Sequence, residues 1–458
     1  MSDQRDRPAS ETITYADAVA AFRPEDIDAR FRGSFADGIN VCVECCDRWA
    51  DDPGRVALAW ESQDGRRGSV TFAELRAQSA AFANLLAARG IGLGDVVACM
   101  LPRIPELLVV ALGTWRAGAV YQPLFTAFGP KAVEHRLKTS GAKLVVTDPV
   151  NRPKLDEVAD VPAIAVVANG STAVAAGDIH FRAEMAQQGV GFEPVPRRGD
   201  DLFLMMSTSG TTGLPKGVPV PLKALPAFYV YMRDAVDLRP EDRFWNIADP
   251  GWAYGLYYAV VGPLMLGHAT TFYDGPFTPE STYRVIEAHG ITNLAGAPTA
   301  YRMLIAAGPE PAARVKGQLR AVSSAGEPLN PEVIRWFDAH LAAPIHDHYG
   351  QTELGMVVNN HHRLRHPVHP GAAGFAMLGY RVAVLDESDR ELPSNQPGVL
   401  AVDIARSPLL WFTGYWQQPT PAIAGGYYRT GDTVELEPDG AVSFVGRNDD
   451  VITSPVTA

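Results

Sequence analysis

The sequence predicts an α/β protein that has two layers of mostly parallel sheet and a small antiparallel unit near its end. Three observations predict this. Helical patterns alternate with short apolar runs over residues 70–118, and the same alternation resumes over residues 202–323. From about Gly379, short β-rich pieces follow one another with turns and no long helix between them. Strands separated by helices form parallel sheets covered on both faces, whereas strands joined by turns pair antiparallel.

The first predicted layer begins with a helix over Val70–Gly90, which has apolar residues at helical spacing and a glycine stop. A buried strand over Asp95–Leu101 and a helix over Glu106–Ala117 follow. Two further apolar runs, 143–147 and 163–168, are expected to be strands of the same sheet.

The second predicted layer contains five strands, at 202–207, 243–247, 270–273, 293–295 and 321–323. A proline-rich, charged stretch at 190–201 indicates a boundary between the layers. The antiparallel unit contains the runs RVAVLD, GVLAVDI and AVSFVG. We therefore divide the chain into segments 1–195, 196–375, 376–446 and 447–458.

Composition limits the function. The chain has 458 residues, is 47% hydrophobic and carries a net charge of −12, so a general nucleic-acid binder is not expected. No apolar run reaches the roughly 18–20 residues of a membrane helix, and the N-terminus has no apolar stretch typical of a signal peptide. The four cysteines are interpreted as buried thiols in a reducing compartment. We expect a cytoplasmic protein.

One motif carries chemistry. Residues 206–218 read MSTSGTTGLPKGV, so a strand runs into a Ser/Thr/Gly stretch that ends at Lys216. Backbone N–H groups of glycines, hydroxyl donors and a lysine together suit a phosphate. Pro215 replaces the second glycine of the common P-loop, so this is a different phosphate loop. The predicted phosphate-binding residues are Thr208, Ser209, Gly210, Thr211, Thr212, Gly213 and Lys216.

The motif resembles the phosphate-loop signature of the adenylate-forming superfamily, which includes acyl-CoA synthetases, luciferases and adenylation domains of peptide synthetases. Further stretches match in the family's order: SAGEP at 324–328, DHYGQTELG at 347–355, YRTGD at 428–432 and GRNDDVI at 446–452. The resemblance covers residues 40–452. It implies an acyl-CoA synthetase-like large domain, in which the antiparallel unit is a β-barrel.

The resemblance also implies roles in binding ATP and Mg²⁺. It places Gly326, Glu327 and Pro328 against one face of adenine, with Tyr349 against the other and Asp347 at the edge. Thr352 is similar to the α-phosphate contact, Glu353 to the Mg²⁺ ligand, and Asp432 to the acceptor of the ribose hydroxyls. Thr208 is a second expected Mg²⁺ contact, and Thr352, Glu353 and Lys216 form the expected catalytic group. Further expected nucleotide contacts are His348, Gly350, Gln351 and Arg447.

The acid to be activated is predicted from three positions. Trp252, in the stretch DPGWAY, is interpreted as lining the acyl pocket. Acetate-activating relatives carry a tryptophan where this chain has Gly350 and a branched residue where it has Ala325. Both positions are small here, so we expect an acid larger than acetate, short-to-medium aliphatic or aromatic. Activation of an amino acid, with Asp249 holding the ammonium group, remains an alternative.

The resemblance implies a further C-terminal lid domain of roughly 100 residues, with a catalytic lysine inside it and Asp449 at its hinge. Only eight residues follow Asp450, and no lysine follows Lys316. We therefore expect that the lid is missing and that adenylation, and thioester formation still more, is impaired. Relatives read about S-A-G-Y-R after the hinge, and loss of one nucleotide turns codons for that string into S-P-V-T-A, residues 454–458. A frameshift, a deliberate truncation and a lid on a separate chain are the explanations considered.

The predicted function is an AMP-forming acid–CoA ligase, whose partners are a small carboxylic acid, ATP and CoA. One alternative is a catalytically silent core that binds nucleotide or acyl-adenylate, and another is an adenylation domain that loads a carrier protein. A homodimer is among the expected assemblies. Six of the eleven histidines lie within 346–369, but Pro367 and Pro370 break any helix that would align them for a metal.

Overall fold

The computed structural model describes residues 13–170, 172–208 and 214–447. Its first sheet has seven strands in the order β7-β6-β5-β3-β4-β8-β9. All neighbours run parallel except β8 and β9. Every residue of β3 and β5 is buried, as expected for strands covered on both faces. The strands are β3 (Val96–Met100), β4 (Val120–Pro123), β5 (Leu144–Thr147), β6 (Ala163–Val166), β7 (Ile179–His180), β8 (Leu202–Ser207) and β9 (Gly217–Pro221).

Helices cover this sheet. α4 (Phe72–Ala88) begins at a capping box made by Thr71 and Glu74, and it ends just before Gly90, whose φ of +69° confirms the predicted glycine stop. α5 (Pro105–Arg116) begins with proline in its first turn and packs against α4. The other helices and turns of this half are α1 (Tyr15–Ala21), α2 (Pro24–Asp28), α3 (Val41–Cys45), η2 (Asp47–Trp49), α6 (Pro130–Ser140), η3 (Arg152–Glu157) and α7 (Phe181–Met185).

The second sheet is mixed. β10, β12, β13 and β14 run parallel, and the antiparallel strands β15, β16, β21, β20, β18 and β17 continue it in that order. The parallel strands are β10 (Phe244–Asn246), β12 (Asn293–Gly296), β13 (Ala321–Ala325) and β14 (Ile345–Gln351). The antiparallel strands are β15 (Gly355–Asn359), β16 (Ala372–Ala376), β17 (Val382–Leu385), β18 (Gly398–Asp403), β20 (Tyr427–Leu436) and β21 (Val442–Arg447), and β19 (Ile423–Ala424) pairs with β20.

A third, three-stranded sheet has the order β11-β1-β2. β11 (Thr270–Tyr273) occupies the predicted residues, but it pairs in parallel with β1 (Val56–Glu61) and not with the second layer. β1 also pairs antiparallel with β2 (Arg67–Thr71). The polar and charged residues of 61–67 concealed β2, in which Arg67 and Ser69 are exposed.

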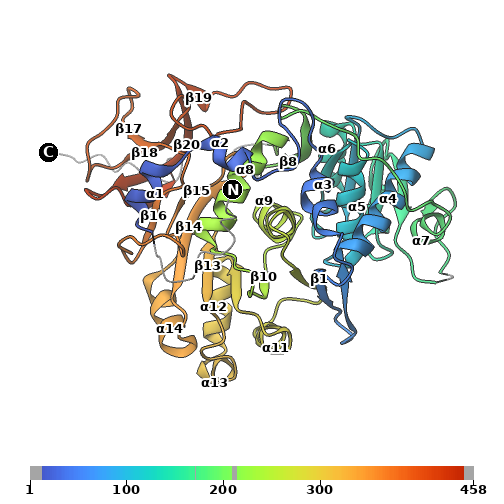
Figure 1. Ribbon diagram of the computed structural model, residues 1–458, viewed down its shortest axis with the longest axis horizontal. Coiled ribbons are helices and arrows are strands. Elements are labelled where there is room, and N and C mark those ends of the chain that lie inside the picture. Colours follow the sequence, from blue (N-terminus) through green and yellow to red (C-terminus); the bar gives the residue numbers. More distant parts are fainter. Residues whose placement is uncertain (1–12, 171, 209–213, 448–458) are drawn as a thin grey trace.

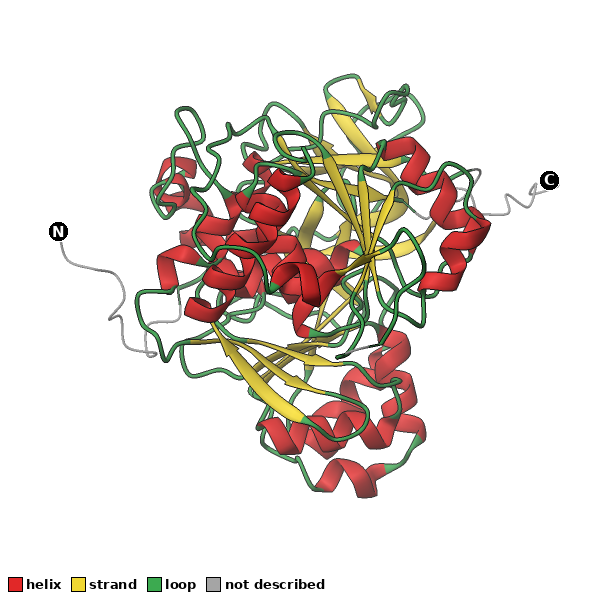
Figure 2. Ribbon diagram, turned by 90° about the vertical axis from the view of Figure 1, so that its right-hand side faces the viewer, coloured by secondary structure: helices red, strands yellow, loops and turns green. Residues whose placement is uncertain are grey.

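Buried aromatic helices join the two halves. α8 (Leu225–Val230), η5 (Tyr231–Ala235), α9 (Ala253–Gly255), η6 (Leu256–Val261) and α10 (Gly262–Met265) follow the short turn η4 (Leu222–Ala224), and their side chains share one core with both large sheets. Figure 1 shows α3–α7 on one side of the molecule and β14–β20 on the other. The parallel part of the second sheet shares a second core with α11 (Pro279–His289), α12 (Pro298–Ala306), α13 (Pro309–Ala313) and α14 (Pro331–Leu341). Figure 2 shows helices packed over the sheets.

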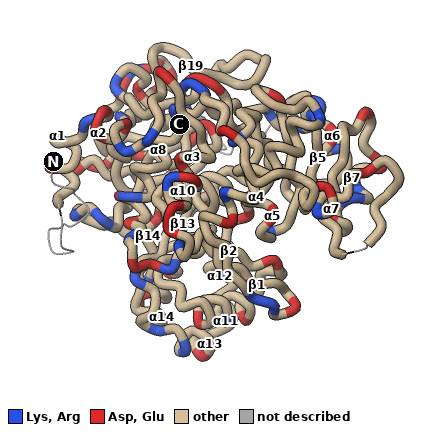
Figure 3. The backbone as a smooth tube through the Cα atoms, turned by 45° about the vertical axis from the view of Figure 1, so that its right-hand side comes forward, with Lys and Arg blue, Asp and Glu red and all other residues tan. Residues whose placement is uncertain are grey.

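The predicted α/β class is confirmed, and closure of the antiparallel strands into a barrel stays a prediction. β8 and β9 lie in the predicted second segment but complete the first sheet, so a division at 195/196 separates them from their neighbours. The division into segments remains a prediction. Within the described ranges no helix is long and apolar enough to cross a membrane. Figure 3 shows basic and acidic residues interspersed along the chain.

Candidate active site

The phosphate-loop motif lies between two paired strands. β8 ends at Ser207 and β9 begins at Gly217. The Thr208 N–H donates to the Lys216 carbonyl at 3.0 Å, and the Lys216 N–H donates to the Thr208 hydroxyl at 3.3 Å. These two bonds fix the ends of the loop relative to each other. The predicted contacts Ser209, Gly210, Thr211, Thr212 and Gly213 lie outside the described residues.

Two of the predicted catalytic residues meet at a tyrosine that the sequence analysis missed. The Lys216 ammonium lies 4.5 Å from the centre of the Tyr415 ring. The Tyr415 hydroxyl donates to Glu353 Oε1 at 2.7 Å. Glu353 and Thr352 occupy the tight turn between β14 and β15, which brings them to this point. The aromatic stretch WFTGYW (411–416) was the available clue, because no other part of the chain places four aromatics within six residues.

Glu353 has the properties of a cation ligand. Its side chain is only 7% exposed. Burial raises the pKa of the Glu353 carboxyl, while the Tyr415 hydroxyl and the Lys216 charge oppose that rise. Among the described residues Glu353 forms no ion pair with a lysine or arginine within 4.0 Å. A buried carboxylate without a paired cation fits Mg²⁺, which prefers oxygen ligands.

A second cluster forms around Asp432 on β20. The Tyr349 hydroxyl donates to Asp432 Oδ2 at 2.5 Å, and the Gln351 side-chain amide donates to the same oxygen at 2.9 Å. The Tyr428 hydroxyl in turn donates to Gln351 Oε1 at 2.9 Å. Both donors to Asp432 use Oδ2, which leaves Oδ1 without a protein donor in the described part of the chain. An acceptor held in this way suits the hydroxyls of a ribose.

Asp347 lies on β14 two residues before Tyr349. Burial raises the pKa of its carboxyl to about 8. Its Oδ1 atom is buried and has no hydrogen-bond partner among the described atoms. A buried polar atom without a partner is costly, so this oxygen is suited to receive a donor from a ligand.

Residues Gly326–Pro328 follow β13 and are exposed. Gly326 has a φ of +98°, a conformation that favours glycine. The Glu327 carboxylate accepts hydrogen bonds from Thr299 and Arg302 on α12. The Glu327 side chain is therefore held against α12. The backbone of the turn Gly326–Pro328 remains exposed and could face a planar base such as adenine.

Two predicted contacts, His348 and Gly350, lie in closely packed surroundings. His348 is buried, with Nδ1 2.8 Å from the Tyr231 hydroxyl and Nε2 3.2 Å from the Asn360 carbonyl, so it contacts the core and not the cluster around Asp432. At Gly350, an added Cβ would lie 2.2 Å from the Gly355 carbonyl oxygen. The backbone of the β14–β15 hairpin thus lies close to this position, and the expectation that the small residue extends the acyl pocket stays a prediction.

The remaining predicted residues are placed as follows. Ala325 is completely buried at the end of β13. Trp252 is half-buried and packs edge-on against Phe128, with the ring centres 5.2 Å apart. The backbone of Arg447 pairs with Asp432 between β21 and β20. The expected hinge residue Asp449 lies outside the described residues.

Asp249, the residue of the amino-acid alternative, and His346 of the histidine-rich stretch 346–369 are both largely buried. The Asp249 carboxylate accepts the Gly251 N–H at 2.8 Å, and burial raises the pKa of its carboxyl. His346 and His362 stack with ring centres 3.9 Å apart, and burial lowers the pKa of His346 to about 4. In the described ranges no three His, Cys, Asp or Glu side chains form a group that could hold a metal ion.

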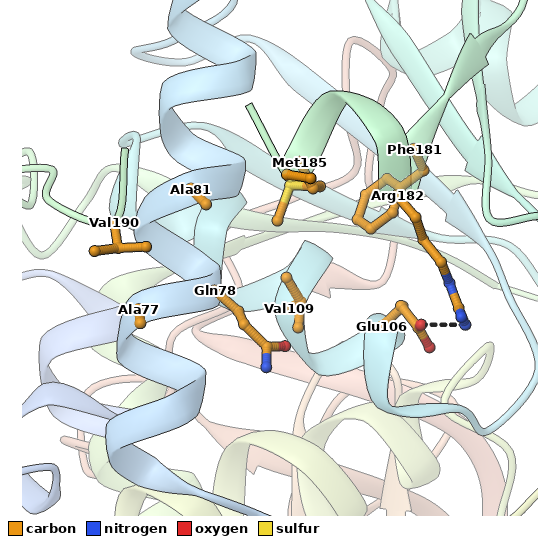
Figure 4. A pocket seen from close by; sticks show the side chains of 10 residues that line it. Ala77, Gln78, Ala81, Glu106, Val109, Phe181, Arg182, Met185 and Val190 are labelled. Atoms are coloured by element: carbon orange, nitrogen blue, oxygen red, sulfur yellow. Dashed lines mark hydrogen bonds and ion pairs between the residues drawn. The ribbon is translucent and has the colours of Figure 1, made fainter. Parts of the chain in front are cut away.

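A cavity of about 310 Å³ lies elsewhere, between α4, α5 and α7 (Figure 4). Its wall is mainly apolar and includes Ala77, Val109 and Met185. The Arg182–Glu106 ion pair, with 2.5 Å between nitrogen and oxygen, borders it. None of the predicted site residues lines this cavity, so it is separate from the candidate active site.

Comparison with solved structures identifies the class of protein that shares this fold and arrangement. An acyl-CoA synthetase of Brucella canis has 64% sequence identity and a TM-score of 0.94, over 96% of this chain and 81% of that chain. The anthranilate CoA ligase AuaEII, solved with anthranoyl-AMP, has a TM-score of 0.81 at 20% identity and shows the shared fold alone.

Sequence comparison then gives the family. Residues 46–416 match the family of AMP-binding enzymes. The acetyl-coenzyme A synthetase of Bacillus subtilis is 35% identical over 90% of this chain and 73% of its own length, and that of Streptomyces avermitilis is 32% identical over 91% and 69%. The chain belongs to the AMP-binding enzyme family and to its acyl-CoA synthetase class. The predicted membership of the adenylate-forming superfamily is thereby confirmed.

Proposed function

We propose that this chain catalyses the AMP-forming activation of a carboxylic acid for transfer to CoA. In the first step, a carboxylate oxygen attacks the α-phosphorus of ATP, and the bond to pyrophosphate breaks to give acyl-AMP. In the second step, the CoA thiol displaces AMP and forms a thioester. The supporting observation is that Lys216, Glu353 and Asp432, from three distant segments, lie in one neighbourhood. The charge of Asp432 contributes to the raised pKa of Glu353, which reflects their proximity.

The residues present suit each part of ATP. Lys216 offers a point charge for a phosphate at the end of its loop. Asp432 accepts hydrogen bonds from the ribose hydroxyls, and the free Oδ1 of Asp347 accepts one from the edge of adenine. Thr352 directly follows β14, which carries Asp347 and Tyr349, and its hydroxyl is proposed to contact the α-phosphate. Roles for Arg447 and for the loop residues 209–213 are part of the same proposal.

Glu353 is the residue that would hold Mg²⁺, with Thr208 as a further oxygen donor. When bound, the ion offsets negative charge on the phosphates of the leaving group. Lys216 contributes the same kind of stabilisation without the ion, because its ammonium lies over the face of the Tyr415 ring, whose hydroxyl donates to Glu353.

We further propose an acid larger than acetate, because Ala325 and Gly350 are both small where acetate-activating relatives carry larger residues. The close backbone at Gly350 makes Ala325 the stronger support. The rings of Tyr254 and Tyr257 both pack edge-on against Tyr258, whose hydroxyl accepts the Met356 N–H of the β14–β15 hairpin at 2.9 Å. Trp252 is proposed to line the pocket. The acetyl-coenzyme A synthetases among the relatives make acetate the natural competitor. Each methylene changes discrimination by only about 1–3 kcal/mol, so an acid panel must decide.

Location, assembly and the second step complete the proposal. The unpaired, buried cysteines support a cytoplasmic enzyme. A homodimer remains a prediction that analytical ultracentrifugation measures. Impaired thioester formation also remains a prediction, and CoA-dependent release of AMP by the 458-residue chain measures it directly.

The deciding experiment is acid-dependent ATP–pyrophosphate exchange with acids from acetate to octanoate and with benzoate. Exchange with one class of acid supports the ligase proposal and identifies the pocket. Mg·ATP binding without exchange supports the silent nucleotide-binding alternative. Exchange followed by transfer to a phosphopantetheine-bearing carrier, and not to CoA, supports the carrier-loading alternative.

A further inference from the structure

Tyr415 occupies a position between two oppositely charged groups. Its ring face lies 4.5 Å from the Lys216 ammonium, and its hydroxyl is 2.7 Å from Glu353 Oε1. Both contacts are of types that stabilise a charge: a cation over an aromatic face, and a hydroxyl donating to a carboxylate. One side chain therefore holds a cation and an anion at the same time.

The surroundings fix Tyr415 in place. Its backbone N–H donates to the Thr420 hydroxyl at 2.8 Å. The next residue, Trp416, donates its N–H to the Gly217 carbonyl at 2.9 Å, directly after Lys216. The Phe412 ring packs edge-on against Tyr415 with 5.3 Å between centres. The segment carrying Tyr415 is thus attached to the strand that follows the phosphate loop.

The two charged groups would otherwise attract each other. Lys216 and Glu353 form no direct ion pair within 4.0 Å in the part of the chain that the structure describes. A direct pair would hold both charges in one contact, and a ligand would have to break that contact before using either charge. In the observed arrangement the Lys216 ammonium and the Glu353 carboxylate each contact the neutral Tyr415 side chain. A ligand can replace these contacts without separating an ion pair.

We propose that Tyr415 is a positioning residue that keeps the Lys216 ammonium and the Glu353 carboxylate apart and ready for Mg·ATP. The inference rests on the proposed function, because it assigns the phosphate to Lys216 and Mg²⁺ to Glu353. The hydroxyl orients the carboxylate, and the ring holds the ammonium. Loss of either contact lets the two charges approach each other and compete with the ligand.

The test is calorimetric titration of the 458-residue chain with ATP at fixed Mg²⁺, repeated at several Mg²⁺ concentrations. Tyr415→Phe removes only the hydroxyl, and Tyr415→Leu also removes the ring. Tyr427→Phe is the matched control, because that half-buried tyrosine likewise donates to a carboxylate, Glu391, outside the site. We expect Tyr415→Phe to weaken Mg·ATP binding about 10-fold, Tyr415→Leu to weaken it further, and Tyr427→Phe to leave it unchanged.

A double-mutant comparison separates positioning from general packing. If Tyr415 acts through Glu353, Tyr415→Phe has little further effect in a chain that already carries Glu353→Gln. Equal binding by Tyr415→Phe and wild type, or a full 10-fold loss on top of Glu353→Gln, overturns the proposal. Circular dichroism and melting curves show whether each variant folds. If Tyr415→Leu does not fold, the result for Tyr415→Phe decides the test.

Binding and exchange also separate the two proposals. If wild type binds Mg·ATP but supports no acid-dependent exchange, the ligase proposal fails while the Tyr415 proposal is still decided by titration. If wild type does not bind Mg·ATP at all, both proposals fail.

Discussion

Replacing Gly350 by alanine tests whether the β14–β15 hairpin requires the missing side chain. The added Cβ would lie 2.2 Å from the Gly355 carbonyl oxygen and 2.7 Å from Met356 Cα, whereas ordinary contact begins at 3.4 Å. The backbone of Gly355 and Met356 must therefore move away from position 350 by roughly 1 Å. Overpacking of a well-filled site costs about 1–3 kcal/mol, and the shift displaces the neighbouring Tyr349 and Gln351.

The assay for Gly350→Ala combines urea unfolding with titration of ATP. We expect a lower unfolding midpoint and weaker ATP binding, because Tyr349 and Gln351 no longer meet at Asp432. The control is Gly92→Ala, since an added Cβ there meets no atom within 4 Å and its φ lies outside the left-handed region. Wild-type stability and ATP binding in Gly350→Ala would refute the reasoning and favour the interpretation of open space at this position.

Three further predictions concern charge and packing at the site. Asp432→Asn removes a charged acceptor and is expected to weaken ATP binding about 10- to 100-fold, with Asp403→Asn as a comparison; unchanged affinity in calorimetry would argue against the ribose role. The pKa of Asp347 is raised above its unfolded value, so its stability contribution is intact below about pH 4 and is lost as pH rises through about 8. Asp347→Asn should therefore flatten the fall of the melting temperature between pH 5 and pH 9, and an unaltered profile contradicts that account. Trp252→Ala is expected to raise the KM of the preferred acid more than that of ATP, and equal effects on both in the exchange assay would remove Trp252 from the pocket.

Much of the fold follows from local sequence patterns. The strands at 96–100 and 144–147 are short, mostly apolar and fully buried, so their composition alone predicts them. Which strands pair with one another is harder to predict from the sequence. β11 joins β1, more than two hundred residues earlier in the chain, and no local pattern encodes that contact.

The candidate site likewise contains residues that the sequence predicts and residues that it does not. The motif residues Lys216, Glu353 and Asp432 could be predicted because they lie in recognisable stretches. Tyr415 could not, since its role depends on the hydrogen bond from Trp416 to Gly217 that brings two distant segments together. Gly350 shows a related difference: a glycine in the sequence suggests open space, and only the hairpin shows that backbone atoms lie close to this position.

Acid-dependent ATP–pyrophosphate exchange, compared between wild type and Glu353→Gln, tests the central claim most directly. The account predicts exchange with wild type that requires an acid and Mg²⁺, and a loss of about 100-fold or more in Glu353→Gln. Exchange of equal rate in both proteins would contradict the assignment of Glu353, and a folded wild type that binds Mg·ATP but exchanges with no acid would contradict the proposed adenylation itself.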